Sequence, residues 1–195
     1  MSLTSKEAAE TLSDVERASR RSAQAFGYSK ASPHLILWGL IWLIGYAVTD
    51  LFPDKANWIW SALVLAGCIG GFLLGRGAAR DGASASGSAA ARRNAARAGW
   101  RSFGLMGIVC AFIASTYAVM WPVQGMQFAA FPALLVGAIY AAVGLWSGPR
   151  YVVTGLLILA LTIGGYFFLH EHFLLWMAGV GGGGLILAGI WFRTA

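Results

Sequence analysis

The amino-acid sequence predicts an all-α, polytopic membrane protein, a bundle of six transmembrane helices built from three helical hairpins. Hydrophobic residues make up 58% of the 195 residues and charged residues only 11%, whereas about a quarter of a soluble domain is charged. Six stretches are apolar over a length that crosses about 30 Å of hydrocarbon as a helix. Since they are continuously apolar and do not alternate with polar residues, helices rather than barrel strands must satisfy their backbone groups.

The predicted spans carry no Asp, Glu, Lys, Arg or His in their interiors, and turn signals separate them. Pro53-Asp54, Gly148-Pro149 and His170-Glu171-His172 each follow an apolar stretch, and such residues favour turns. In chain order, the predicted spans are residues 35–52, 58–75, 102–121, 128–146, 151–169 and 173–192. With their connecting loops they form a transmembrane domain over residues 34–195.

Residues 1–33 are predicted to form a separate cytosolic segment that is amphipathic and basic. Ser13 and Glu16 have the spacing of a capping box, which predicts that a short helix begins there. Ser32 and Pro33 are predicted to be the N-cap and the first residue of the first span, because proline favours the first helical position.

The segment between the second and third spans, residues 76–101, is predicted to be a flexible, basic cytosolic loop. It opens with Gly, Ala and Ser, which is typical of a flexible linker, and continues into an Ala/Arg-rich stretch that predicts a basic helix at the membrane surface. Its arginines could contact anionic lipid or a protein partner, although anchoring by positive charge explains them as well. No nucleic acid is expected, because no aromatic residues are interleaved with them. These arginines are Arg92, Arg93, Arg97 and Arg101.

The distribution of Lys and Arg predicts that both termini lie in the cytosol. The expected location is a plasma membrane, of the bacterial cytoplasmic (inner) membrane type. On this topology thirteen of the fourteen basic residues are cytosolic, and only Lys55 lies outside. Cytoplasmic loops are enriched in Lys and Arg in this way, so the net charge of +6 is explained without nucleic acid. The cytosolic residues are Lys6, Arg17, Arg20, Arg21, Lys30, Arg76, Arg80, Arg92, Arg93, Arg97, Arg101, Arg150 and Arg193.

Glycines spaced four residues apart predict close helix packing in the second and sixth spans. Small residues at this spacing let two helix backbones approach each other in a membrane. The packing is either within the bundle, which needs several such seams, or between two copies in a homodimer. The residues are Gly67, Gly71 and Gly75 in the second span, and Gly179 and Gly183, together with Ala178 and Gly182, in the sixth.

The first and last hairpins also resemble each other weakly. Gly45-Tyr46 is followed by Trp60 in the first, and Gly165-Tyr166 is followed by Trp176 in the last. Both hairpins leave and return to the same side, so a repeat would be parallel rather than inverted. Apolar helices also resemble one another by composition alone.

Five polar residues are expected together at the outer face, where they are candidate metal ligands. Imidazoles and carboxylates bind Zn and Cu. However, two histidines separated by one residue point in different directions on a helical backbone, so a solvated loop is the simpler interpretation. No metal and no other cofactor is therefore assigned. The five residues are Asp50, Asp54, His170, Glu171 and His172.

No motif in the sequence indicates catalysis, and the chain is expected not to be an enzyme. The favoured hypothesis is a non-enzymatic accessory or regulatory subunit, which contacts the lipid bilayer and, through residues 1–33 and 76–101, a cytosolic or membrane protein. Leu12, Val15 and Phe26 give the first of these segments a weak apolar stripe.

The alternative hypothesis is a small transporter or channel for a neutral or small solute. Its path would be lined by Tyr, Thr and Ser side chains of the spans. Coupling to an ion through side chains is not expected, because the spans lack ionisable residues at mid-depth.

Overall fold

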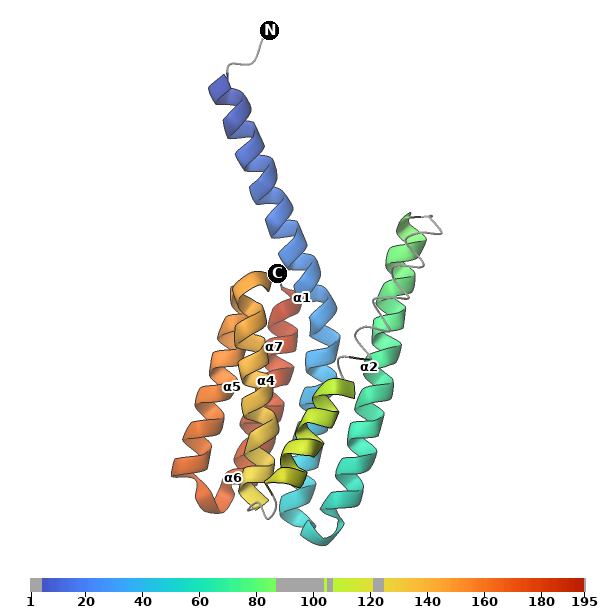
Figure 1. Cartoon of the computed structure of the whole chain (residues 1–195), viewed down its shortest axis with the longest axis vertical. Helices are drawn as coiled ribbons and strands as arrows, with labels where there is room; N and C mark the ends of the chain where they lie inside the picture. Colours follow the sequence, from blue (N-terminus) through green and yellow to red (C-terminus); the bar gives the residue numbers. More distant parts are fainter. Residues whose placement is uncertain (1–4, 87–103, 105–106, 121–124, 195) are drawn as a thin grey trace.

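The structure is a computed structural model of the whole chain, and it describes residues 5–86, 104, 107–120 and 125–194. Every regular element among these residues is a helix, and none is a strand. The long helices α1 and α2 run in opposite directions, as do α4 and α5, and the last helix runs opposite to α5 (Figure 1). At one end of the bundle the first two helices project beyond the others, and the C-terminus lies at that same end.

The elements follow one another with short connections wherever the structure describes them. The long helices α1, α2, α4 and α5 comprise Ser5–Leu51, Ala56–Ser86, Gly125–Ser147 and Pro149–Phe168. A shorter apolar helix, Gly107–Val119, lies between α2 and α4. Two 3₁₀ turns, η1 (Pro53–Lys55) and η2 (His170–His172), precede α2 and the last helix. That last helix consists of α6 (Phe173–Trp176), the π-helical η3 (Met177–Gly182) and α7 (Gly183–Arg193).

In the part of the chain that the structure describes, five helices are long and apolar enough to cross a membrane, and they suggest a membrane-embedded protein. Because every regular element among the described residues is a helix, the all-α prediction is confirmed. The third predicted span lies only partly within the described residues, where it forms the shorter helix, so the arrangement of six spans in three hairpins stays a prediction. The five helices are Glu10–Leu51, Pro53–Gly77, Gly125–Ser147, Pro149–Phe168 and His170–Arg193.

The prediction that Ser32 is an N-cap and Pro33 the first residue of a helix is wrong, because α1 is one helix of 47 residues with Pro33 inside it. An internal proline removes one backbone hydrogen bond and crowds the preceding turn. Tertiary contacts on both sides of Pro33 offset this cost. Ser32 is completely buried and Leu35 is 1% exposed, and the Ser32 hydroxyl donates to the carbonyl oxygen of Gly189 at 2.6 Å.

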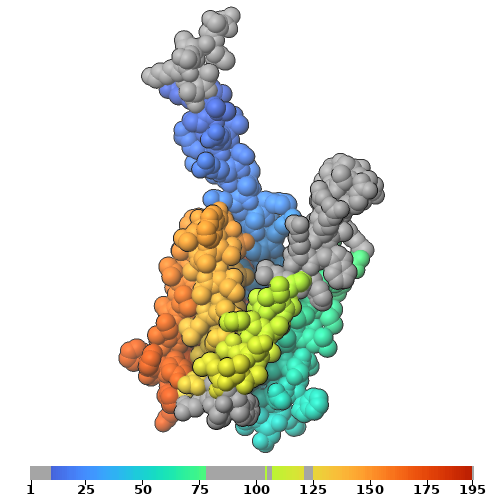
Figure 2. Space-filling model, in the orientation of Figure 1, coloured from blue at the N-terminus to red at the C-terminus, as the bar shows by residue number. Residues whose placement is uncertain are grey.

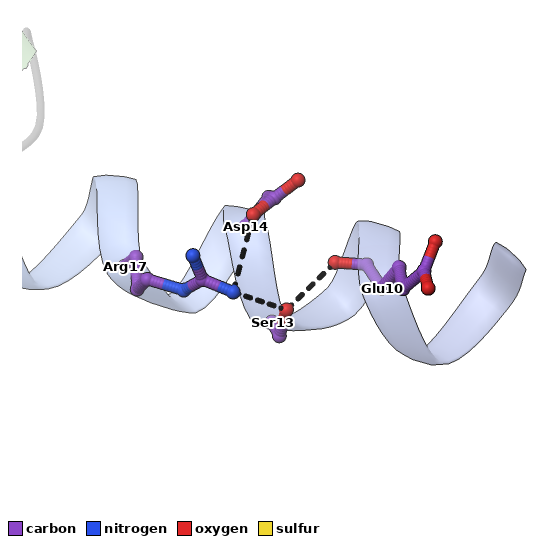
Figure 3. Close-up of polar contacts among 4 residues, drawn as sticks. All are labelled: Glu10, Ser13, Asp14 and Arg17. Carbon is purple, nitrogen blue, oxygen red and sulfur yellow. Dashed lines mark hydrogen bonds and ion pairs between the residues drawn. The ribbon is translucent and has the colours of Figure 1, made fainter. Parts of the chain in front are cut away.

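The predicted capping box at Ser13 and Glu16 is also wrong, because both residues lie in the interior of α1. The Ser13 hydroxyl donates to the backbone oxygen of Glu10 at 2.8 Å and accepts from Arg17 Nη2 at 2.9 Å (Figure 3). Arg17 also pairs with Asp14 at 3.4 Å. These are neighbouring contacts on one exposed helix face, which stabilise a helix that has already begun.

The predicted flexible loop was expected to start at residue 76, but α2 continues past Arg76 as far as Ser86. This stretch contains several alanines, the residue with the highest helix propensity, and it follows an apolar helix that has already nucleated. The remainder of the loop, residues 87–101, lies outside the described residues.

A seam of small residues brings α1 into backbone contact with the last helix. A Cβ atom added to Gly39 would lie 2.8 Å from the carbonyl oxygen of Gly182, and one added to Gly182 would lie 2.5 Å from the Leu43 nitrogen. One turn from the end of α7, a Cβ on Gly189 would lie 3.0 Å from the Ser32 oxygen. Only glycine allows the backbones this close, and such contact holds helices together where lipid gives no hydrophobic drive.

A second seam joins α4 to α5 in the same way. A Cβ atom on Gly137 would lie 3.1 Å from the Gly155 oxygen, and Cβ atoms on Gly155 and Gly144 would collide with backbone atoms of the facing helix. Between the two seams lies the apolar core, whose largest fully buried side chains are Phe173, Phe192, Leu35, Met177 and Leu185.

We expect Gly182→Leu to destabilise the protein by about 3 kcal/mol, because the new side chain must separate α1 from η3. The matched control is Gly183→Leu, since a Cβ at Gly183 has no neighbour within 4 Å among the described residues. Both variants can be compared by unfolding in mixed detergent micelles, followed by circular dichroism. Equal stability of the two variants would show that the seam does not hold the helices together.

Candidate functional site

A cluster of aromatic rings lies where α1 leaves the bundle. Tyr28 of α1 contacts Tyr151 at the start of α5, with ring centroids 5.4 Å apart, and meets Phe192 of α7 edge-on at 5.0 Å. Tyr151 and Phe192 also meet edge-on at 4.9 Å. Tyr28 is 4% exposed and Phe192 is fully buried. We call these three residues, together with Ser32 and Arg150, the α1 anchor.

Hydrogen bonds connect the same three elements. The backbone N–H of Arg150 donates to the Tyr28 hydroxyl at 3.3 Å, and the Tyr151 hydroxyl donates to the Gly27 oxygen at 3.2 Å. The first bond satisfies an N–H at the beginning of α5 that has no partner within its own helix. Ser32 donates to Gly189 and accepts from Arg193 Nε at 3.0 Å. The anchor thus joins α1, the start of α5 and the end of α7.

The Arg150 side chain caps the C-terminal end of α7. Its guanidinium lies over the rings of Tyr28 and Trp191, 5.4 Å and 5.0 Å from their centroids. It donates to the Trp191 carbonyl oxygen and, at 3.3 Å, to the Thr194 hydroxyl. A cation is favourable at a helix C-terminus, whose last carbonyls have no partner within the helix.

The turn between α4 and α5 requires glycine for this arrangement. Gly148 has φ 125°, in the left-handed region that favours glycine. A Cβ atom there would also collide with the Tyr28 hydroxyl. The turn signal at Gly148-Pro149 was visible in the sequence, but its contact with α1, which lies more than a hundred residues earlier, was not.

Beyond the anchor, the N-terminal part of α1 extends away from the bundle. Figure 2 shows this segment standing clear of the other helices. Leu12, Val15 and Phe26 are 63%, 60% and 58% exposed, so the predicted apolar stripe is not covered. Ser19 and Ser22, both exposed, continue the stripe at a spacing of three and four residues. This spacing is that of a helix face that packs along another helix.

Basic side chains gather at the end of the bundle from which α1 projects. Arg17, Arg20, Arg21 and Lys30 lie exposed in the N-terminal part of α1, and Arg150 and Arg193 lie in the anchor region. Lys30 Nζ lies 4.2 Å from the Phe26 ring centroid. Lys55, in η1, lies at the opposite end. The predicted lipid or partner contacts Arg92, Arg93, Arg97 and Arg101 fall outside the described residues.

The candidate metal ligands all lie at the end of the bundle opposite the anchor. Asp50 lies in the last turn of α1 and Asp54 in η1, while the other three form η2, and all five are exposed. The His170 ring lies 6.2 Å from that of Tyr166. Among the described residues, no three His, Cys, Asp or Glu side chains gather closely enough to hold a metal ion.

The predicted glycines of the second span differ in their surroundings. A Cβ on Gly67 would lie 2.6 Å from the Ile41 side chain of α1, whereas one on Gly71 would lie 3.7 Å from the His34 ring. His34 Nε2 also lies 3.1 Å from the Gly71 oxygen. A Cβ on Gly75 has no neighbour within 4 Å in the described part of the chain. Close packing with α1 is therefore strongest at Gly67.

In the last span, only part of the predicted set of small residues makes close contacts with another helix. Cβ atoms on Gly179 and Gly183 would have no neighbour within 4 Å among the residues described. The contact with α1 runs through Gly182 and Gly189 instead. The sequence offers glycine at several successive positions here, so its spacing alone leaves open which face meets another helix.

The two hairpins that resemble each other in sequence share one structural contact. In the first, the indole of Trp60 lies against Gly45, and a Cβ there would be 2.7 Å from it. In the last, the indole of Trp176 lies against Gly165 so closely that a Cβ would collide with it. In each hairpin, a tryptophan of the returning helix covers a glycine of the outgoing helix.

Comparisons with models of protein families, with curated proteins and with solved structures find no match to this chain.

We expect Ser32→Ala to destabilise the fold by about 1 kcal/mol, because it removes a buried hydrogen bond between α1 and α7 and leaves a small void. Ser29→Ala is the matched control, since the exposed Ser29 hydroxyl donates only to Phe26 O in its own helix at 3.1 Å. Denaturation in detergent measures both variants. If Ser29→Ala costs as much as Ser32→Ala, the bond across the seam contributes nothing specific.

Proposed function

We propose that this chain is a non-enzymatic accessory or regulatory subunit of a bacterial cytoplasmic membrane, with six spans in three hairpins and both termini in the cytosol. Its N-terminal segment and the 76–101 loop contact a cytosolic or membrane protein, and a homodimer is one form that this contact takes. The observation that carries the proposal is the continuity of α1, which joins an exposed apolar stripe to the core of the bundle.

The anchor supports this proposal because it fixes the direction in which the exposed part of α1 leaves the bundle. Tyr28 and Ser32 are buried against α5 and α7 only a few residues from Phe26. A helix held in this way presents Leu12, Val15 and Phe26 in one orientation. Binding of a partner then costs less conformational entropy than it would if this segment of α1 were a mobile tail.

The chemistry of the exposed segment indicates the kind of partner. An apolar stripe with serines at intervening positions suits an amphipathic helix of the partner, which would pack along it. The basic residues at this end of the bundle suit the anionic inner leaflet. Within the bilayer, α2 is the least buried of the five candidate spans in the described structure, which supports a contact there with a second membrane helix or a second copy.

The hydrogen bonds of three hydroxyls, those of Tyr46, Tyr117 and Thr116, favour this function over the alternative transporter or channel. Tyr46 donates to the Ala129 oxygen at 2.7 Å and Tyr117 to the Phe128 oxygen at 2.6 Å. Thr116 donates to the Phe112 oxygen of its own helix at 2.8 Å. Hydroxyls that already donate to the backbone are poor substitutes for the hydration shell of a passing solute.

The proposed topology predicts which positions an impermeant thiol reagent reaches. With Cys68 and Cys110 replaced by alanine, we expect a cysteine at Asn57 to react in intact cells whose outer barrier is permeable. A cysteine at Glu10 should react only after the cells are opened, because the basic end of the bundle is cytosolic. Both positions are exposed. Labelling of position 10 in intact cells would reverse the orientation.

The partner contact predicts that the double variant Leu12→Gln, Val15→Gln loses its partner while the bundle stays folded. The matched control is Glu10→Gln, Arg21→Gln, which introduces the same residues on the opposite face and keeps the net charge. Proteins cross-linked to the chain in membranes should fall at least tenfold in the stripe variant and stay constant in the control, as measured by quantitative mass spectrometry.

Removing residues 2–22, which leaves the anchor intact, should have the same effect as the stripe variant. The transporter alternative predicts the opposite pattern in a liposome flux assay. Flux that survives this deletion and is lost in Thr162→Val or Tyr166→Phe would contradict the accessory function.

A further inference from the structure

A cavity of about 270 Å³ lies between α5 and the last helix. Leu157, Ile158 and Leu161 of α5 form one wall, and Met177, Gly184 and Leu187 of the last helix belong to the other. Trp176 and Trp191 also line it. An apolar cavity of about 150 Å³ already binds a small hydrocarbon, so this larger one can hold a longer apolar group.

One buried hydroxyl in this cavity has no partner. Thr154 is 4% exposed and lines the cavity, and its Oγ1 makes no hydrogen bond within the described structure. A buried hydroxyl is normally paired, and an unpaired one calls for a specific explanation. The hydroxyl therefore suggests that the occupant of the cavity carries a hydrogen-bond acceptor at this position.

The cavity borders the surface that faces lipid. Leu157 is 54% exposed and Leu187 is 69% exposed, although both line the cavity. Among the lining residues, the polar side chains are the two threonines and the two tryptophans. A chain that enters sideways from the bilayer therefore meets an almost wholly apolar wall.

The position of Thr154 along α5 matches the depth of a lipid ester. Thr154 follows Arg150 by four residues, or about 6 Å of helix, and the headgroup layer of a bilayer is about 5 to 8 Å thick on each side. With Arg150 at headgroup level, the Thr154 hydroxyl lies at the upper edge of the hydrocarbon. From Thr154 to Thr162 the cavity wall runs about a further 12 Å, which suits an extended acyl chain.

The geometry of the last helix creates this space. Residues Met177–Gly182 form a π-helical segment, which is wider than an α-helix and often marks a functional site. The segment contributes Met177, Val180 and Gly181 to the lining, and a Cβ on Gly184 would have no neighbour within 4 Å among the described residues.

From these observations we infer that the cavity binds one acyl chain of an anionic phospholipid from the leaflet at the Arg150 end, with a lipid ester oxygen accepting a hydrogen bond from Thr154. The guanidinium groups of Arg150 and Arg193, at the same end, favour an anionic headgroup. The site is independent of the partner contact proposed for α1, because none of its lining residues belongs to that helix.

Native mass spectrometry of the purified chain tests this inference with dioleoyl phosphatidylglycerol, dioleoyl phosphatidylcholine and free oleic acid as probes. We expect the wild type to retain one phosphatidylglycerol molecule more tightly than either other probe. Gly184→Phe fills the cavity and should weaken this binding at least tenfold. Gly183→Phe, the matched control, adds the same side chain at a position outside the lining and should leave binding within twofold of the wild type.

Thr154→Val keeps the shape of the side chain and removes only its hydroxyl, so it decides the question if Gly184→Phe fails to fold. We expect phosphatidylglycerol binding about fivefold weaker, as for one lost hydrogen bond. The melting temperature of the lipid-free variant should be equal to or higher than that of the wild type, because an unpaired buried hydroxyl is gone. A purely structural threonine would instead lower the melting temperature.

Three results would overturn the inference. The first is phosphatidylglycerol binding that Gly184→Phe and Thr154→Val both leave unchanged. The second is oleic acid bound as tightly as the phospholipid, which would make a free fatty acid the ligand. The third is a dimer of the chain that Gly184→Phe abolishes, which would mean that a second copy fills the cavity.

Discussion

The close contact between α1 and the last helix is the interaction on which the rest of this structure depends. At Gly39 and Gly182 the two backbones touch, and the buried Ser32 hydroxyl joins them again at Gly189. In a bilayer the apolar side chains gain little from leaving lipid, so van der Waals contact between backbones and interhelical hydrogen bonds must hold the bundle. The seam joins α1, including the part around its internal proline, to the last helix.

The end of this seam explains how a helix that is apolar in the membrane continues into a polar environment. Arg150 and Tyr28 satisfy backbone groups at the ends of α5 and α7 while their neighbours exclude water. The same last turn of α7 serves the lipid cavity through Trp191, whose ring lines the cavity and whose carbonyl oxygen accepts from Arg150. The proposed partner contact of α1 and the proposed lipid cavity are thus both supported by the last turn of α7, and each is proposed to bind a different ligand.

The glycines illustrate how much of the packing the sequence could predict. A spacing of four residues correctly indicates that small residues lie on one helix face, and Gly67 does meet α1 closely. In the run from Gly179 to Gly184, however, the spacing fits more than one face, and the π-helical turn shifts the register of all that follows. The contact therefore falls on Gly182, because the facing surface of α1 offers Gly39 there.

The sequence by itself determined the all-α class, the presence of several long apolar helices and the turns at Pro53, Gly148 and His170, because these depend on hydropathy over one helix length and on local turn chemistry. Only the tertiary structure decided that Ser32 is a buried partner of Gly189 rather than a helix cap, that α1 passes through Pro33 unbroken, and that Thr154 faces a cavity. Each of these depends on a residue far along the chain. Local propensity is worth about 1 kcal/mol or less for most residues, and such contacts outweigh it.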